Sequence, residues 1–210
     1  MAGDRGVPAP GTVGLTFDDG PDPVWTPVVL DILDEYGVTA TFFVLGWKVD
    51  AHPELAREIV VRGHSIQVHG YHHNLYPALT DAQIRRGLAG SVGAIYRATG
   101  VRPTCFRAPG GASTDRVAGI SQEFGLTIVR WDFNTADYVL QSAPGVLRKL
   151  LLAEPDQSVL MHDIWGVYWQ SSLPTALAEF ATRGYVYDTV CANNGPYGRV
   201  RVMQVGISAR

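Results

Sequence analysis

The sequence has few cysteines, little net charge and no long apolar run. Its two cysteines, Cys105 and Cys191, are too few for a disulfide-rich scaffold, and neither has the CxxC or Cys/His spacing of a zinc site. We therefore expect two buried free thiols, with a single bridge between them as the alternative that spacing leaves open.

Neither sign of charge dominates the chain, in which 17 Lys and Arg residues stand against 20 Asp and Glu residues for a net charge of -3. This balance excludes the basic footprint of proteins that bind nucleic acid or anionic membranes. A neutral or weakly charged substrate fits the composition better.

Apolar segments are all shorter than the roughly 20 residues that a membrane helix needs, so we expect no membrane span. Residues 1–11 also lack the apolar run of a signal peptide. The sequence as it stands predicts a cytoplasmic protein, and a secreted or cell-wall associated protein is expected if a leader has been removed. We expect a monomer.

Hydrophobic residues make up 46% of the chain, which is enough to form one large core. No break in composition indicates two domains. We expect residues 1–210 to form a single domain, with its core at about 12–190 and a C-terminal tail at 192–210. In that tail, Val200 to Val205 could add an edge strand.

Short apolar segments alternate with amphipathic segments of helix length, a pattern typical of parallel βα units. The expected strands are Thr12–Phe17, Ala40–Leu45, His64–Val68, Pro103–Phe106, Leu126–Arg130, Ser158–Met161 and Tyr185–Asp188. The expected helices are Thr26–Tyr36, Glu54–Arg62, Thr80–Thr99, Ser142–Ala153 and Leu173–Arg183. This order predicts an α/β fold, a distorted, incomplete (β/α) barrel with about seven parallel strands, and an open doubly wound sheet is the alternative.

The longest expected helix begins with Thr80 and Gln83 at the spacing of a capping box. Gly87, Gly90 and Gly93 lie inside it, and each interior glycine costs about 1 kcal/mol relative to alanine. We expect a neighbouring element to pack closely on this helix and compensate.

In both candidate folds ligands bind beyond the carboxyl ends of the strands, so polar residues there are candidate site residues. The first strand ends in Thr16-Phe17-Asp18-Asp19-Gly20-Pro21. Two adjacent carboxylates at a strand end point in different directions, which suits one to bind a cation and the other to act as a base. The alternative is a pair of turn or helix-capping aspartates.

The third strand leads into His69-Gly70-Tyr71-His72-His73. His69 and His73 share a face if the chain makes one helical turn there, and imidazoles so spaced are natural metal ligands. The spacing alone is a weak motif, and His72 competes with His73. With Asp19 the pair makes a two-histidine, one-carboxylate set that leaves positions open for water and substrate, as a catalytic metal requires.

Later strands also end in polar residues. Arg107 can hold a carboxylate with a two-pronged hydrogen bond, while Gly110 leaves a backbone N–H free to face an oxyanion. His162 could act as a general acid, with Asp137 setting its tautomer and raising its pKa. The alternatives are a simple turn at Arg107 and a hydrogen-bonded core histidine at His162.

The order of these motifs resembles that of the polysaccharide deacetylase family, also called carbohydrate esterase family 4, over about Val13 to Val190. The family's TFDDGP matches Thr16 to Pro21, which implies that Asp18 is the catalytic base and Asp19 a metal ligand. Its H(S/T)xxH matches His69 to His73, which implies that both histidines bind the metal. Gly70 stands where a hydroxyl residue is usual.

The family's RxPxG matches Arg107 to Gly111, which implies that Arg107 orients Asp18 and that the N–H of Gly110, where an aromatic residue is usual, stabilises the oxyanion. The DxxDW motif becomes Asn134 to Tyr138, in which Asp137 tethers the acid and Tyr138 replaces a tryptophan wall. Leu160 and His162 match the last motif, which implies an apolar acetate pocket and the general acid. Trp165, Tyr168 and Trp169 could stack on sugar rings or pack against the last helix.

The resemblance implies a metal-dependent hydrolase that removes acetyl groups from N-acetylated saccharides of the chitooligosaccharide, chitin or peptidoglycan type. Zn²⁺ is the expected metal, and Co²⁺, Ni²⁺ and Mn²⁺ also suit the ligands. The alternatives are an esterase of the same fold acting on O-acetylated xylan, an amidohydrolase acting on a small cyclic amide, and an inactive carbohydrate-binding protein.

Overall fold

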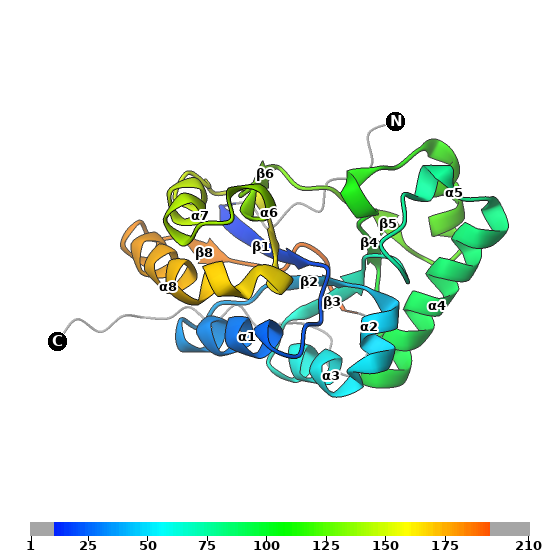
Figure 1. Cartoon of the computed structure of the whole chain (residues 1–210), viewed down its shortest axis with the longest axis horizontal. Helices are drawn as coiled ribbons and strands as arrows, with labels where there is room; N and C mark the ends of the chain where they lie inside the picture. The colour runs from blue at the N-terminus through cyan, green and yellow to red at the C-terminus, as the bar shows by residue number, and fades with distance from the viewer. Residues whose placement is uncertain (1–10, 194–210) are drawn as a thin grey trace.

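The structure is a computed structural model that describes residues 11–193, and Figure 1 shows how its elements are arranged. The strands are β1 (Thr12–Asp18), β2 (Thr41–Val44), β3 (Ser65–Val68), β4 (Cys105–Phe106), β5 (Thr127–Ile128), β6 (Phe133–Asn134), β7 (Ser158–His162) and β8 (Val186–Tyr187). The α-helices are α1 (Trp25–Glu35), α2 (Gly46–Ala51), α3 (Pro53–Val61), α4 (Asp81–Thr99), α5 (Asp115–Gln122), α6 (Asp137–Leu140), α7 (Ala143–Leu150) and α8 (Gly166–Thr182). The short 3₁₀ helices are η1 (Tyr76–Ala78), η2 (Pro109–Gly111) and η3 (Asp163–Trp165).

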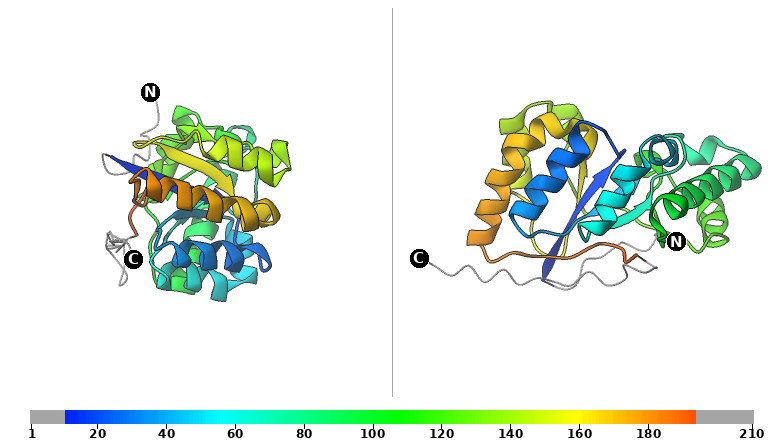
Figure 2. Two further views of the ribbon diagram at one scale, coloured as in Figure 1. Left: turned by 90° about the vertical axis from the view of Figure 1, so that its left-hand side faces the viewer. Right: turned by 90° about the horizontal axis from the view of Figure 1, so that it is seen from below.

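The strands form a parallel sheet in the order β5-β4-β3-β2-β1-β7-β6, and β8 pairs with β1 beside this path. The sheet curls into a half-barrel with helices along its outer side, which Figure 2 shows from two further directions. The expected α/β fold, a distorted and incomplete barrel, is therefore confirmed. No helix within residues 11–193 has the length and apolar character to cross a membrane.

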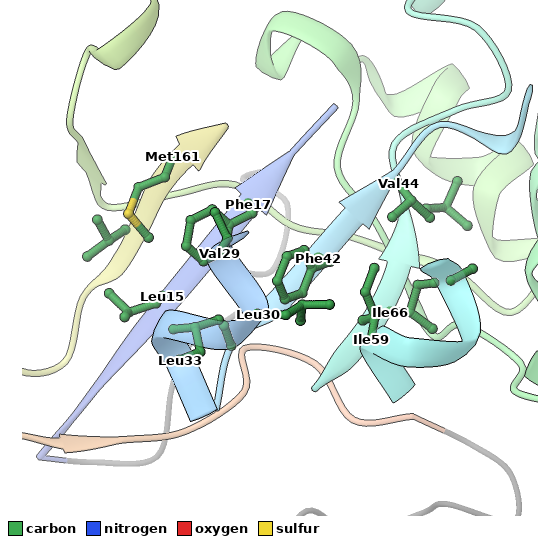
Figure 3. Packing of buried hydrophobic residues seen from close by; sticks show 14 of the residues in the cluster. Leu15, Phe17, Val29, Leu30, Leu33, Phe42, Val44, Ile59, Ile66 and Met161 are labelled. Carbon is green, nitrogen blue, oxygen red and sulfur yellow. The ribbon is translucent and has the colours of Figure 1, made fainter. Parts of the chain in front are cut away.

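Successive strand residues point to opposite faces of this sheet, and the two faces differ in composition. Val13, Leu15 and Phe17 of β1 belong to the main hydrophobic core. Figure 3 shows this core between the strands and the helices α1 and α3 that cover them. Thr16 and Asp18 alternate with these residues and so lie on the inner face of the half-barrel, which leaves that face for polar side chains.

The sequence analysis did not predict β6, α2, α5 and α6. The longest of these, α5, has 8 residues, so none is long enough to display a clear hydrophobic period. The last helix begins at Gly166, seven residues before the expected start at Leu173. Pro174 lies inside this helix, although proline is usually found in a first turn, so its position in the sequence is a misleading start signal. The edge strand suggested for residues 200–205 lies outside the described residues.

Helix α4 has the expected capping box at Thr80, and a neighbouring element packs closely on two of its three interior glycines, whereas Gly93 meets only Arg97 of the same helix. A Cβ at Gly87 would lie 2.9 Å from the Tyr76 hydroxyl oxygen, and one at Gly90 would lie 2.9 Å from Tyr71 Cδ2. The glycines therefore let two tyrosines from the loop after β3 rest against the helix, which explains why their low helix propensity is tolerated.

Cys105 and Cys191 form a disulfide with Cα atoms 6.3 Å apart, so the expectation of two free thiols is wrong. The segment 189–193, here called the closing segment, brings the sulfur atoms together by pairing with the start of β3. Asn193 Oδ1 accepts a hydrogen bond from the Ile66 N–H at 3.0 Å, and the Ser65 hydroxyl donates to the Cys191 carbonyl at 2.5 Å. Sequence spacing could not reveal this pairing, because it depends on where the chain lies after β8.

Replacing both cysteines by alanine should lower the free energy of unfolding, because the bridge closes a loop across a sequence separation of 86. The chain-entropy relation gives about 4 to 5 kcal/mol for such a loop. Urea denaturation with and without reductant measures the effect: reduced wild type should resemble Cys105→Ala/Cys191→Ala. A wild type that is indifferent to reductant would contradict a bridge that stabilises the fold.

Candidate metal and catalytic site

Asp18 and Asp19 are consecutive, yet their side chains have different partners. Asp18 ends β1 and is buried, whereas Asp19 follows with a φ of 75°, in the left-handed region that non-glycine residues seldom adopt. Asp18 Oδ1 accepts a hydrogen bond from Arg107, while Asp19 faces His69 and His73. The turn in the backbone at Asp19 therefore separates the two carboxylates, as the strand-end position predicts.

Asp19, His69 and His73 come together from the loops after β1 and β3. Asp19 Oδ1 lies 3.4 Å from Nε2 of His69 and 3.5 Å from Nε2 of His73, and one ligand atom of each residue lies within 4.8 Å of the others. This oxygen is buried and has no hydrogen-bond partner in the part of the chain that the structure describes. A buried carboxylate oxygen beside two imidazole nitrogens, without a donor of its own, suits a divalent cation.

The surroundings keep Asp19 ionised and fix the tautomer of His69. Burial raises the pKa of Asp19, but the neighbouring imidazoles of His69, His162 and His73 outweigh burial and lower the pKa to about 2. The His69 Nδ1–H donates to the Arg107 carbonyl at 2.7 Å. His69 Nε2 therefore keeps its lone pair on the side of Asp19, as a metal ligand requires.

The segment from His69 to His73 is a bend, so the helical turn that would place the two histidines on one face is not formed. Gly70 has a φ of 94°, and a Cβ there would lie 2.9 Å from the Tyr76 hydroxyl oxygen, which excludes a larger residue. The rings of His69 and His73 still lie close together, with centroids 5.3 Å apart. His72 is exposed and lies outside the ligand group, so it does not compete with His73.

Arg107 links Asp18 to this group. Its side chain is fully buried, and Nη1 donates both to Asp18 Oδ1 at 2.8 Å and to the Thr16 hydroxyl at 2.6 Å. A single nitrogen reaches Asp18, so the expected two-pronged contact is wrong. The guanidinium carbon lies 4.0 Å from the centroid of the Phe43 ring, which holds it by a cation–π contact. Through its carbonyl and its guanidinium, Arg107 orients His69 and Asp18 together.

His162 and Asp137 form a second pair next to Asp18. The β1–β7 register places His162 beside Asp18, and buried Asp137 accepts hydrogen bonds from the His162 backbone N–H at 2.8 Å and from Nδ1 at 2.9 Å. Burial lowers the pKa of His162, but the hydrogen bond and charge of Asp137, with the charges of Asp18 and Asp19, outweigh it and raise the pKa to about 9. The raised pKa favours the protonated form of His162, whose Nε2–H is then the proton it can donate.

Two of the expected oxyanion and substrate residues, Gly110 and Tyr138, are exposed. Gly110, with a φ of 64°, is exposed, and a Cβ there would lie 3.6 Å from Leu75 Cδ2. Leu75 is 58% exposed, so a leucine from another loop stands next to the position that lacks an aromatic ring. Tyr138 is 44% exposed and its ring meets His162 edge-on, with centroids 5.3 Å apart.

The other residues expected to contact substrate differ in their burial. Leu160 is buried in β7 on the inner face, between the core residues of that strand. Trp165 is half-buried and stacks on Tyr168, with centroids 6.3 Å apart. Trp169 is fully buried and donates its indole N–H to the His162 carbonyl, so it supports the candidate acid and cannot stack on a sugar.

The sequence analysis missed Asp163, which holds the loop after β1. Its buried carboxylate accepts a hydrogen bond from the Thr26 hydroxyl at 2.5 Å and occupies the space that a Cβ on Gly20 would take. Burial raises the pKa of Asp163 to about 7. Its position directly after His162 was the available signal, because a strand-end residue next to a candidate acid also lies near the site.

Comparison with known proteins gives four further findings: one family model, two relatives and one solved structure. Residues 5–129 match the family model described as polysaccharide deacetylase. The peptidoglycan-N-acetylglucosamine deacetylase PgdA of Listeria monocytogenes is 36% identical over 85% of the chain, which spans only 38% of that protein's length. A chitooligosaccharide deacetylase of Bradyrhizobium is 36% identical over 72% of the chain and 70% of its own length.

Among solved structures, a family 4 carbohydrate esterase from Streptomyces lividans in complex with acetate is 31% identical, with a TM-score of 0.81. The match covers 85% of the chain and 92% of the esterase. The similarity therefore extends over most of the described residues.

Zn²⁺ added to the metal-free protein should raise its thermal unfolding midpoint, because a ligand that binds only the folded state stabilises it. The gain is about 2 to 3 kcal/mol when free metal exceeds its Kd a hundredfold. Asp19→Asn should lose most of this shift, and Asp18→Asn should keep it, as differential scanning calorimetry would measure. Equal shifts in the wild type and Asp19→Asn would rule out this ligand set.

Proposed function

The chain belongs to the polysaccharide deacetylase family, and we propose that it is a metal-dependent hydrolase that releases acetate from N-acetylated amino sugars. The observation that carries the proposal is the meeting, at the carboxyl ends of the strands, of a three-residue ligand group, a buried carboxylate and a histidine paired with a buried aspartate. Residues 1–210 act as one catalytic domain in this proposal.

Asp19, His69 and His73 hold the metal, which is Zn²⁺ by preference because two imidazoles and one carboxylate suit it, with Co²⁺, Ni²⁺ and Mn²⁺ as substitutes. When bound, the cation supplies a Lewis acid for the acetyl carbonyl and makes water more acidic. The unpartnered Asp19 Oδ1 and the fixed tautomer of His69 support this assignment.

Asp18 is the base. Arg107 occupies its Oδ1, so Oδ2 is the oxygen that accepts a proton from the attacking water. Oδ2 lies 3.8 Å from His69 Nδ1, which keeps the base beside the metal ligands. Arg107 is a positioning residue, because it acts by holding Asp18 and not by touching the substrate.

His162 is the acid. The water oxygen attacks the acetyl carbon, the carbon–nitrogen bond then breaks, and His162 Nε2–H protonates the departing amine, which leaves acetate and a free amino sugar. The backbone N–H of Gly110 stabilises the oxyanion that precedes bond cleavage. Leu160 lines the acetate pocket, while Tyr138 and Trp165 contact the sugar.

The names of the relatives support an N-acetylated amino sugar of the peptidoglycan or chitin type as substrate. The same groups could hydrolyse an O-acetyl ester or a small cyclic amide, since they activate water without selecting the acyl group. A protein that binds saccharides without turnover is the remaining alternative, and the assay below separates all three.

We also propose that the protein works outside the cytoplasm. The Cys105–Cys191 disulfide supports this location, because such bridges persist in oxidising compartments and are rare in the cytosol. A relative named for acting on peptidoglycan agrees with secretion or association with the cell wall.

Acetate release should be abolished in Asp18→Asn, falling by at least about a hundredfold, because the amide cannot accept the proton of the attacking water. The assay uses zinc-loaded wild type and variant on acetylated chitooligosaccharides, peptidoglycan fragments, acetylxylan and small imides, with and without chelator. Near-native activity of Asp18→Asn would exclude Asp18 as base. Saccharide binding without acetate release by the metal-replete wild type would leave only the non-catalytic alternative.

The acid assignment predicts how activity declines at high pH. A pKa raised to about 9 means that His162 loses its proton, and the enzyme its acid, as pH rises through this value. Asp137→Asn removes the negative charge that raises the pKa of His162. Burial, which lowers this pKa, is unchanged in the variant. The alkaline limb of kcat should therefore move to lower pH in this variant, whereas an unmoved limb with reduced kcat would indicate that Asp137 only supports the fold.

A further inference from the structure

A cavity of about 510 Å³ is lined in part by the loop that carries the candidate ligand His73. We call it the Arg86 pocket, and its lining residues come from α2, from the loop after β3 and from α4: Asp50, Tyr71, His72, Asn74, Tyr76, Leu79, Gln83, Arg86, Gly87, Gly90 and Arg97. His72 and Asn74 flank the candidate ligand His73. The pocket therefore adjoins the loop that holds His73, and a molecule bound at the proposed metal ligands lies near it.

The walls of the pocket are held in place by packing and hydrogen bonds. Tyr71 and Tyr76 rest on α4 where Gly90 and Gly87 leave room for their rings. The Tyr71 hydroxyl also donates to Asp50 Oδ2 at 3.0 Å. The cavity is therefore a preformed feature, of the size typical of ligand sites, and not a gap between unrelated side chains.

Charge in the pocket is unbalanced. Asp50 and Arg97 form an ion pair at 2.7 Å and neutralise each other. Arg86 is exposed and forms no hydrogen bond or ion pair with any other residue from 11 to 193. The pocket therefore presents one unpaired guanidinium, which prefers a carboxylate or phosphate as partner. The small negative net charge of the whole chain hides this local excess.

We propose that the Arg86 pocket binds a carboxylate carried by the saccharide, and so selects acidic glycans of the peptidoglycan type over neutral chitin. The proposal rests on the proposed function, which supplies the saccharide at the metal ligands. Sugars in peptidoglycan carry lactyl groups and peptides with free carboxylates, whereas chitin chains carry none. Hydroxyl and amide groups from Tyr71, Asn74 and Gln83 suit the polar remainder of such a substituent.

Kinetics of Arg86→Gln on two saccharides of equal length test this proposal. One is an oligomer of N-acetylglucosamine, and the other alternates N-acetylglucosamine with N-acetylmuramic acid bearing free lactyl carboxylates. The variant should lose about threefold to tenfold in kcat/KM on the acidic saccharide, mainly through KM, because one exposed charge-assisted contact is removed. Its kcat/KM on the neutral saccharide should stay within about twofold of wild type, which is less than the loss expected when one charge-assisted contact is removed.

Arg85→Gln is the matched control. Arg85 is the next residue on α4, but its guanidinium pairs with Glu123 at 2.8 Å and does not line the pocket. This variant should leave the preference for the acidic saccharide unchanged. Equal losses on both saccharides in Arg86→Gln, no loss on either, or the same preference change in Arg85→Gln would each overturn the proposal.

Failure of the proposed function gives a different result. If the zinc-loaded wild type releases no acetate from either saccharide, the proposed deacetylation of N-acetylated amino sugars is wrong, and the pocket is then tested by titration calorimetry with the same two saccharides. Tighter binding of the acidic one that Arg86→Gln removes supports the pocket. Equal affinities overturn it.

Discussion

Arg107 carries its charge into the interior of the half-barrel, where a guanidinium is tolerated only with a carboxylate and hydrogen bonds around it. Asp18 supplies the carboxylate and Thr16 a further acceptor. Removing one member of such a pair typically costs about 3 to 5 kcal/mol, since the other charge is left buried alone. Because the Arg107 carbonyl also accepts the His69 Nδ1–H, one residue positions both the proposed base and a proposed metal ligand.

The central position of β1 makes this arrangement possible. Its neighbours β2 and β7 bring their own carboxyl ends to the same edge, and the register sets Asp18 between Phe43 and His162. Alternation then sends Phe17 into the helix-covered core and Asp18 to the inner face. A shift of one residue in the β1–β7 register would exchange these faces and place a carboxylate in the apolar core. The core and the site therefore impose the same register on the sheet.

The sequence predicted the fold class and the strand ends well, because hydrophobic alternation reports on faces and because parallel strands end at one edge. It did not predict geometry that depends on contacts between distant segments. The bend after His69 follows from the Tyr76 hydroxyl crowding Gly70, and the disulfide follows from Asn193 pairing with β3. Arg107 reaches Asp18 with a single nitrogen because its other terminal nitrogen, Nη2, donates to the Arg130 carbonyl. No local pattern encodes these distances.

The groups assigned to the chemistry and the groups suited to select a substrate occupy different parts of the molecule. Asp18 and His162 lie on neighbouring strands, where register and burial restrict them to nearly one geometry. Leu75 and Tyr138 stand on the loops beyond those strands and are largely exposed, so a change there alters the surface without disturbing the core. Tyr71 belongs to both parts: it seats the histidine-bearing loop on α4 and walls the neighbouring cavity. Selectivity could therefore change in this fold by exchanging loop residues, while a change to the strand-end residues would act on the buried charge pair and on the proposed metal ligands together.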